Sequence, residues 1–270
     1  LMGIDACQEL MPNVNHVAVF DTAFHQSMEA SNFLYALPYE VYEKYRVRRY
    51  GFHGTSHFYV SHRAAEMLGK PFEECKIITL HLGNGASMAA IKGGKVVDTT
   101  MGFTPLEGLV MGTRSGDIDP AIVFFLMEKL GLSTTEANSY FNKKSGMLGL
   151  SGVSNDLRDI LEAAASGNQR AQTALDVYYN RVKGYIGNYM AKLNGCDCLV
   201  FTAGVGENAI DIRENICKDL DYLGVKMDVE KNKVRGKEVD VAAADSKIKI
   251  FVIPTNEELV IARDTYRLSK

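Results

Sequence analysis

Residues 76–120 read KIITLHLGNGASMAAIKGGKVVDTTMGFTPLEGLVMGTRSGDIDP, and this stretch decides the fold. Three β-rich runs, Lys76–Leu82, Ala86–Ile91 and Val96–Thr99, are separated by short glycine turns. Such turns join antiparallel neighbours, so the stretch predicts a three-stranded meander. The first turn, Gly83-Asn84-Gly85, has two interpretations. Asn-Gly is a common hairpin signal, and the flanking glycines also leave backbone N–H groups free to wrap an anion such as phosphate.

A glycine-spaced loop follows the meander from Met101 to Gly116 and carries Arg114. Asp119-Pro120 then predicts a helix start, with Asp as N-cap and Pro at the first helical position. Arg114 is therefore held between two structured elements. Two uses are open for its guanidinium: a surface salt bridge, or a bidentate fork for a carboxylate or phosphate group.

The composition is that of an ordinary folded protein. The chain has 270 residues, 46% of them hydrophobic, and a formal net charge of -3, which allows one large core or two modest ones. Without a basic field, nucleic acid and anionic membrane surfaces are poor partners. The longest strongly apolar run, Ala121–Met127, is far shorter than the ~20 residues that span a bilayer. Five cysteines, an odd number without a C-x-x-C pair, favour a reducing cytoplasm.

An apolar run, Val17–Phe20, ends abruptly in Asp21. This pattern predicts a strand that delivers a carboxylate at its C-terminal end, where the ligands of α/β sheets gather. An ordinary turn or cap is the alternative role for Asp21.

A helix is expected to run to Leu68 and to close at Gly69, with Thr55 or Ser56 as its cap. His53 lies between two glycines just before this N-terminus, where free amides and the helix dipole favour an anion. His53 and His57 have the i, i+4 spacing of a metal pair, but no further ligands with zinc-type spacing follow. All six histidines fall in the first third of the chain, so a histidine cluster is expected there: His16, His25, His53, His57, His62 and His81.

The second half of the chain predicts mostly helices. Ser133–Glu136 reads as a capping box and Asp156 opens another helix. Apolar residues then recur every three to four positions from Asn168 to Leu193, which indicates one long amphipathic helix. Gly184 and Gly187 inside it each cost roughly 1 kcal/mol against Ala, so we expect them to pack closely against another helix, of this chain or of a partner subunit.

A buried strand, Cys198–Thr202, leads through the glycine turn AGVGENA into a helix expected over Ile210–Leu220, and forms a second phosphate-compatible site. The chain has no P-loop motif. The turn matches the dinucleotide pattern, but Glu207 places a carboxylate where pyrophosphate should lie, and Asp228 is a weak candidate for the acidic residue expected ~20 positions on. The alternative is a nucleotide held by two separated turns, with Gly83–Gly85 on the phosphates and Gly204–Asn208 beneath the nucleoside.

Seven runs carry a resemblance over nearly the whole chain and in unbroken order: VAVFDTAFHQ, YGFHGTSH, HLGNGAS, MGFTPLEGLVMGTRSGDIDP, NKKSG, AGVGEN and IPTNEELVIARDT. They resemble the acetate kinase family, within the superfamily of acetate and sugar kinases, Hsp70 and actin. The resemblance implies an α/β chain of the RNase H-like (actin-like ATPase) fold, mostly the C-terminal domain of a two-domain kinase. It divides the chain into the end of the N-terminal domain (1–22), the nucleotide-binding domain (23–256) and a helix that returns to the first domain (257–270).

The family's N-x-G-S-S-S-x-K phosphate turn and its N-terminal substrate arginine are absent. By resemblance the chain begins where about the first third of such a kinase has passed, and alone it is expected to be inactive. The missing segment would be truncated, unseen, or cleaved and still associated as a separate chain.

The resemblance also assigns site residues. Asp21 resembles the catalytic aspartate near the magnesium, and His53 and Arg114 resemble the groups that stabilise the transition state, with Arg114 also facing the substrate carboxylate. Glu257 matches the magnesium-binding glutamate. The segments around the nucleotide are His81, Leu82, Gly83, Asn84, Gly85, Asp156, Leu157, Arg158, Gly204, Val205, Gly206, Glu207 and Asn208.

The implied reaction is reversible transfer of a phosphoryl group between ATP and acetate, giving acetyl phosphate and ADP, with Mg²⁺ or Mn²⁺. Direct in-line transfer is expected, and a covalent phosphoenzyme on a glutamate is the alternative. Other hypotheses are a propionate or butyrate kinase, or an actin-like nucleotide-binding module without carboxylate chemistry. Arg114 and His53 discriminate the last, because a pure nucleotide clamp needs no carboxylate fork. A cytoplasmic homodimer that serves acetyl-CoA biosynthesis is expected from the family.

Overall fold

The computed structural model describes residues 1–270 and contains one six-stranded sheet of order β3-β2-β1-β4-β6-β5. The strands are β1 (Lys76–Leu82), β2 (Ala86–Lys92), β3 (Lys95–Thr99), β4 (Cys198–Thr202), β5 (Val239–Asp240) and β6 (Lys249–Val252). Strands β1, β4 and β6 are parallel, while β2, β3 and β5 pair antiparallel with their neighbours. The predicted meander is confirmed, and the short β5 was not foreseen.

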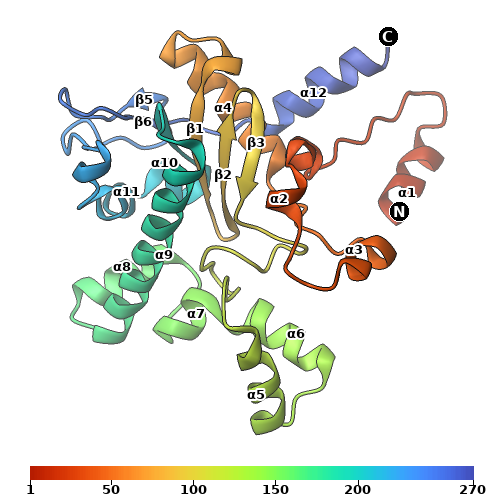
Figure 1. Ribbon diagram of the computed structural model, residues 1–270, viewed down its shortest axis with the longest axis horizontal. Coiled ribbons are helices and arrows are strands. Elements are labelled where there is room, and N and C mark those ends of the chain that lie inside the picture. The colour runs from red at the N-terminus through yellow and green to blue at the C-terminus, as the bar shows by residue number, and fades with distance from the viewer.

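Helices surround this sheet and include three 3₁₀ segments. The α-helices are α1 (Met2–Leu10), α2 (Ala30–Phe33), α3 (Tyr39–Tyr45), α4 (Gly54–Leu68), α5 (Pro120–Leu130), α6 (Thr134–Lys143), α7 (Gly146–Ser151), α8 (Leu157–Ala165), α9 (Gln169–Leu193), α10 (Ala203–Asn208), α11 (Ile210–Cys217) and α12 (Glu257–Leu268). The 3₁₀ segments are η1 (Ala23–Ser27), η2 (Phe72–Glu74) and η3 (Asp221–Leu223). Figure 1 shows α5 to α8 gathered at one end of the sheet.

Two apolar clusters cover the two faces of the sheet. On β1, Ile78 and Leu80 point into the larger cluster, which contains the buried face of α9. Ile77 points the other way, into a smaller cluster that contains Val60 and Ala64 of α4. This alternation is the period-2 pattern of a strand buried on both faces. The polar residues of β1 that share the α4 side can therefore meet the side chains of α4.

The predicted helix caps that follow the meander are confirmed. Asp119 accepts a hydrogen bond from the Ala121 backbone N at 2.9 Å and caps α5. Ser133 and Glu136 form both halves of a capping box at α6. Short polar side chains at these positions satisfy amides that the helix itself leaves free.

Two predictions in the first half are wrong. Val17–Phe20 is not a strand, because no neighbouring strand is present for it to pair with, and Phe20 is 68% exposed. Helix α4 is not capped by Thr55 or Ser56. The helix begins at Gly54, so its N-cap residue is His53, which precedes both predicted caps. The His53 backbone is left-handed with φ 57°, and its side chain makes no cap hydrogen bond.

Three predictions in the second half need correction. Gly184 and Gly187 do not pack closely within the chain, since a Cβ added at either would meet no atom within 4 Å. The stretch Gly204–Asn208 is not a turn but lies inside α10, because Ala203 adopts φ 63° and turns the end of β4 directly into a helix. Helix α11 ends at Cys217 rather than Leu220, and η3 follows.

The two ends of the chain meet. The side-chain amide of Asn15 donates to the backbone oxygen of Ser269 at 3.2 Å, and Figure 1 shows α1 and α12 projecting on the same side of the sheet. Within α12 only Val260 is buried. None of the helices combines the length and the apolar character that crossing a membrane requires.

Candidate active site

The two phosphate-compatible segments lie side by side at the carboxyl ends of β1 and β4. Gly83 and Gly85 close the turn after β1 with a backbone hydrogen bond of 3.1 Å. A Cβ added at Gly83 would lie 3.9 Å from the Cβ of Ala203, the first residue of α10. Since β1 and β4 are parallel neighbours, their ends form one edge, which is where ligands of such sheets bind.

Asn84 joins this edge to two other segments. Its backbone oxygen accepts a hydrogen bond from Gly112 N at 3.0 Å, and its side-chain oxygen accepts one from Asn155 Nδ2 at 3.1 Å. The turn therefore contacts both the loop that carries Arg114 and the residue just before Asp156. Segments separated by more than 70 positions in the sequence are brought together here.

Arg114 and His53 converge above Gly85. A Cβ added at Gly85 would lie 3.0 Å from Arg114 Nη2 and 3.5 Å from His53 Nε2. Arg114 Nη1 donates to the Pro105 oxygen at 2.6 Å, and partial burial lowers the pKa of Arg114. Arg114 makes no ion pair within the chain, so the salt-bridge interpretation is wrong. Its free edge faces a position that only a glycine leaves open.

Asp21 is fixed against the start of α4 rather than at the end of a strand. Its Oδ2 accepts a hydrogen bond from the backbone N of His53 at 2.5 Å, and its backbone oxygen accepts one from Gly54 N at 2.7 Å. A Cβ at Gly54 would lie only 2.2 Å from the Asp21 oxygen, so this approach requires glycine. The backbone N of His53, the N-cap of α4, thereby holds the Asp21 carboxylate.

Four of the six histidines form the expected cluster. The rings of His53 and His81 stack, with centroids 4.0 Å apart and planes inclined by 18°. His57 and His25 lie beside them, with their own ring centroids 5.7 Å apart. Burial lowers the pKa of His53 to about 4, an effect that Asp21 partly opposes, and burial lowers the pKa of His81 to about 3. Burial also holds the pKa of His57 well below its ordinary value.

Glu257, the first residue of α12, adds a second carboxylate to this edge. Its pKa is raised by burial and by the negative charges of Asp21 and Glu258. No group of three or more His, Cys, Asp or Glu side chains in the chain could hold a metal ion alone. Mg²⁺ in nucleotide sites commonly takes one or two carboxylates and leaves its other positions to water and phosphate oxygens. The donor set therefore fits Mg²⁺ bound together with a nucleotide.

The remaining candidate nucleotide residues are held by local contacts. Asp156 caps α8 and pairs with Arg158 at 2.6 Å, and the Arg158 side chain is 87% exposed. The Glu207 carboxylate accepts a hydrogen bond from the Thr255 backbone N at 3.1 Å. Glu207 thus ties α10 to the segment before α12, and no pyrophosphate turn of the dinucleotide type exists at Gly204–Ala209.

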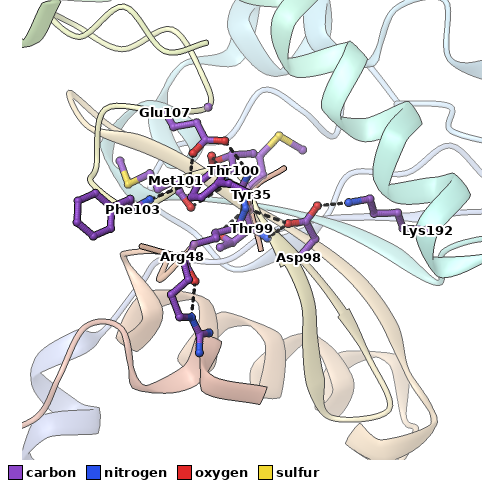
Figure 2. Close-up of polar contacts among 12 residues, drawn as sticks. Tyr35, Arg48, Asp98, Thr99, Thr100, Met101, Phe103, Glu107 and Lys192 are labelled. Atoms are coloured by element: carbon purple, nitrogen blue, oxygen red, sulfur yellow. Dashed lines mark hydrogen bonds and ion pairs between the residues drawn. The ribbon is translucent and has the colours of Figure 1, made fainter. Parts of the chain in front are cut away.

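A polar network anchors the loop that delivers Arg114 (Figure 2). Arg49 donates to the backbone oxygens of Thr99, Thr100 and Met101 at 2.9–3.2 Å, and to Glu107 at 2.6 Å. Tyr35 also bonds Glu107. Because three backbone oxygens and a carboxylate share one guanidinium, the exit of β3 and the loop after it are fixed together.

Sequence reasoning missed the hydroxyl groups that hold the histidines. Ser87 Oγ lies 2.8 Å from His53 Nδ1 and 2.8 Å from His57 Nε2, while Ser56 Oγ lies 2.8 Å from His81 Nδ1. One signal was available for Ser87: a turn centred on Asn84 sets the β1–β2 register, which places His81 opposite Ser87. No comparable signal pointed to Ser56.

The sheet matches that of solved acetate kinases, which have the actin-like ATPase fold, and the chain is a kinase by its relatives. The chain belongs to the acetokinase family, whose model matches residues 1–263. It is 85% identical to the acetate kinase of Syntrophomonas wolfei over 270 residues, 100% of this chain and 68% of that protein.

Two solved kinase structures match nearly the whole length of this chain. The Porphyromonas gingivalis acetate kinase matches with a TM-score of 0.96 and 51% identity over 99% of this chain and 67% of that one. A propionate kinase from Francisella tularensis matches with a TM-score of 0.93 and 47% identity over 98% of this chain and 68% of that one. The chain thus spans about two thirds of the length of these relatives.

Proposed function

We propose that the protein transfers a phosphoryl group reversibly between ATP and acetate, giving acetyl phosphate and ADP. The observation that carries the proposal is the convergence of Arg114 and His53 above Gly85, at the sheet edge where the turn after β1 meets α10. Relatives named acetate kinase at 85% and 60% identity support the choice of acetate.

The chemistry follows from charge. A carboxylate and a polyphosphate repel each other, so the site must neutralise both and align the attacking and leaving oxygens. Arg114 presents its free Nη2 edge toward Gly85 and can bind a carboxylate or an equatorial phosphoryl oxygen. His53 Nε2 lies near the same position above Gly85 and donates to the transferring group. Donors fixed before the reaction stabilise the charge without reorganising.

Glu257 is the residue we propose to hold Mg²⁺, or Mn²⁺, together with the nucleotide, and Asp21 lies beside it. The bound ion would neutralise charge on the phosphate oxygens. Asp21 also receives the His53 backbone N, so the same carboxylate fixes the start of α4. The other nucleotide contacts are proposed for His81–Gly85, Asp156–Arg158 and Gly204–Asn208.

We propose direct in-line transfer rather than a covalent phosphoenzyme on a glutamate. The donors that face Gly85 are a guanidinium and an imidazole, and Glu257 is assigned to the metal. With chiral phosphate oxygens, one in-line displacement inverts the configuration at phosphorus and two displacements retain it. Retention would contradict the proposal.

The decisive test is Arg114→Ala in the complete protein, because this chain alone is expected to be inactive, with Arg267→Ala on the exposed part of α12 as the matched control. Acetyl phosphate is trapped as hydroxamate, and ATP binding is measured by calorimetry. We expect Arg114→Ala to lower kcat/KM for acetate by about 10²- to 10³-fold while ATP still binds, and Arg267→Ala to behave as wild type. Normal turnover in the Arg114→Ala variant of the complete protein would refute the assignment. A complete wild-type protein that binds ATP without forming acyl phosphate would favour an actin-like binding module.

Acyl chain length is the second choice to test, because one solved relative is named a propionate kinase. We propose acetate as the preferred acid. Each buried methylene contributes about 0.8 kcal/mol, so discrimination among acetate, propionate and butyrate rests on small differences. A kcat/KM that rises from acetate to propionate would assign the protein to the longer acid.

We propose that the protein is a cytoplasmic homodimer whose contact surface includes α9. Gly184 is exposed and lines an open cleft of about 550 Å³ with Asp117, Val177, Asn180, Arg181, Tyr185 and Asn188. Sedimentation should show a dimer, and Gly184→Leu should shift it toward the monomer. We also propose that 1–22 and 257–270 form one structural unit distinct from 23–256, which the bond between Asn15 and Ser269 supports.

A further inference from the structure

A chain of hydrogen-bonding side chains runs from His53 into the space between the sheet and α4. Ser87 Oγ lies 2.8 Å from His53 Nδ1 and 2.8 Å from His57 Nε2. His57 Nδ1 lies 2.7 Å from Thr79 Oγ1. Thr79, Ser87 and His57 are all 0% exposed. Each neutral imidazole and each hydroxyl in this chain carries one proton, so the direction of one hydrogen bond determines the direction of all three.

Thr79 sets that direction. Its Oγ1 has two acceptors within reach, the His57 Nδ1 at 2.7 Å and the Ala89 backbone oxygen at 3.5 Å. Hydroxyl hydrogen bonds are normally 2.5–3.0 Å long, so the proton of Thr79 belongs to the bond with His57. His57 then carries its own proton on Nε2 and donates it to Ser87, and Ser87 donates to His53 Nδ1.

We infer that Thr79, His57 and Ser87 are positioning residues that hold His53 as the neutral tautomer with its proton on Nε2. That nitrogen faces Gly85 together with Arg114 Nη2. Both groups above Gly85 are then hydrogen-bond donors, as a site for an anionic acyl or phosphoryl oxygen requires. With the opposite direction, His53 would present a lone pair to the anion. The inference rests on the proposed function for its catalytic meaning, since it explains how His53 donates without being charged.

Two further contacts hold the His53 ring in the orientation in which Nε2 faces Gly85. His81 stacks on His53 at 4.0 Å and is itself held by Ser56. The backbone N of His53 is bonded to Asp21. The ring therefore cannot turn over to exchange its nitrogens without breaking the stack and the Ser87 contact, and only the proton pattern along the relay can change the tautomer.

Nitrogen-15 NMR of histidine-labelled protein reads the tautomer directly, because protonated and bare imidazole nitrogens have well-separated shifts. His53→Gln identifies the His53 signals. We expect His53 to be bare at Nδ1 and protonated at Nε2. A proton on Nδ1 overturns the inference. This measurement needs no turnover, so it remains decisive even if the wild type makes no acyl phosphate and the proposed function fails.

Thr79→Val tests the relay from its far end with an isosteric side chain. We expect kcat to fall by about 10- to 100-fold, with KM for ATP and acetate nearly unchanged and His53 shifted toward the Nδ1–H tautomer. Thr79→Ser restores the hydroxyl and should recover kcat. The matched control is Thr99→Val, which loses a buried hydroxyl bond to the Met88 oxygen at 2.9 Å outside the relay. Equal kcat losses in Thr79→Val and Thr99→Val would overturn the inference, and Ser87→Ala replaces Thr79→Val if that variant fails to fold.

Discussion

Gly85 sets the distance between the two donors of the candidate site. It lies at the end of the turn after β1, its backbone conformation is one that other residues adopt, and a Cβ would meet Arg114 Nη2 at 3.0 Å and His53 Nε2 at 3.5 Å. We therefore infer that glycine is needed at position 85 because it leaves space for a ligand, and not because the backbone requires a positive φ.

Gly85→Ala should leave the fold intact and reduce turnover. The added methyl occupies the space where an anion would contact both donors, so we expect kcat/KM for acetate to fall by about 10²-fold, with a melting temperature close to wild type. Hydroxamate trapping and thermal unfolding check the two parts. Gly204→Ala is a control for methyl addition on the nucleotide side, since a Cβ there has no neighbour within 4 Å. Unchanged acetate kinetics in Gly85→Ala would contradict the proposed ligand position.

At the residue scale, spacing and residue type marked Arg114, His53 and the glycine turn as candidates, and the structure brings the three together. Their roles stay predictions. Spacing and residue type did not place Asp21 correctly. Its carboxylate was expected at a strand end and instead accepts a hydrogen bond from the backbone N of His53, the N-cap of α4. The relay was missed because Thr79 and Ser87 are ordinary strand residues in sequence. Their importance arises only when strand register and the α4 face are combined.

Among the elements, α9 contains two helix-interior glycines, Gly184 and Gly187, where an added Cβ would have no neighbour within 4 Å. At a protein concentration low enough to dissociate the proposed dimer, Gly184→Ala should therefore raise the free energy of unfolding by about 0.5–1 kcal/mol, because Ala loses less backbone entropy in a helix. Urea unfolding measures it. Gly69→Ala is the control with the opposite expected sign. The surroundings of Gly69 are equally open, but its φ of 65° is left-handed, so Gly69→Ala should lower the free energy of unfolding. A destabilised Gly184→Ala would mean that a neighbour already fills this space.

Arg213 of α11 joins α10 to the irregular segment that precedes β5. It is fully buried and donates to Gly206 O, Asn232 Oδ1, Asn232 O and Val234 O at 2.8–2.9 Å. All four acceptors are neutral, and burial lowers the pKa of Arg213 to about 10.

Arg213→Lys should lower the free energy of unfolding by about 2–4 kcal/mol, because an ammonium cannot reach four divergent acceptors and leaves buried oxygens unpaired. Since Gly206 lies in the proposed nucleotide segment, KM for ATP should rise more than KM for acetate. Urea unfolding and steady-state kinetics test these effects. Equal stability of Arg213→Lys and wild type would show that water replaces the lost contacts.

Local sequence pattern identified the meander, α9 and β4, and the Asp119-Pro120 start signal identified α5. The local pattern failed where the outcome depended on distant chain. Val17–Phe20 has the composition of a strand but no partner strand, and AGVGEN has the composition of a turn but forms α10 because Ala203 takes a left-handed φ. Pairing and local strain of this kind are properties of the assembled fold.

For the whole molecule, the buried histidine cluster predicts sensitivity to acid. The folded-state pKa of His81 is lowered to about 3 from an ordinary 6.5, so the unfolded chain binds more protons between these values. The contribution of neutral His81 to the free energy of unfolding is therefore fully present above pH 6.5 and decreases as the pH falls toward 3. From His81 alone the loss at pH 5 is about 2 kcal/mol, and His57 adds to it in the same direction.

Urea unfolding at pH 7 and pH 5 tests this dependence. His81→Asn should flatten the pH dependence, whatever it does to the absolute stability. His16→Gln is the control, because His16 is exposed and lies outside the cluster. A wild type whose stability is the same at both pH values would show that the cluster is hydrated or already charged.

The segment between β6 and α12 has a mechanical consequence. The Thr255 backbone N is bonded to Glu207, its hydroxyl to Ser56 at 2.8 Å, and Asn256 caps the helix that follows. These contacts fix Thr255, and with it the start of α12 at Glu257. A rigid-body rotation of α12 about Thr255 would leave the Glu257 carboxylate nearly in place. Ser269 would move farthest, because a helix rises by about 1.5 Å per residue. Spin labels at Glu258 and Ser269 would separate the still end from the moving one.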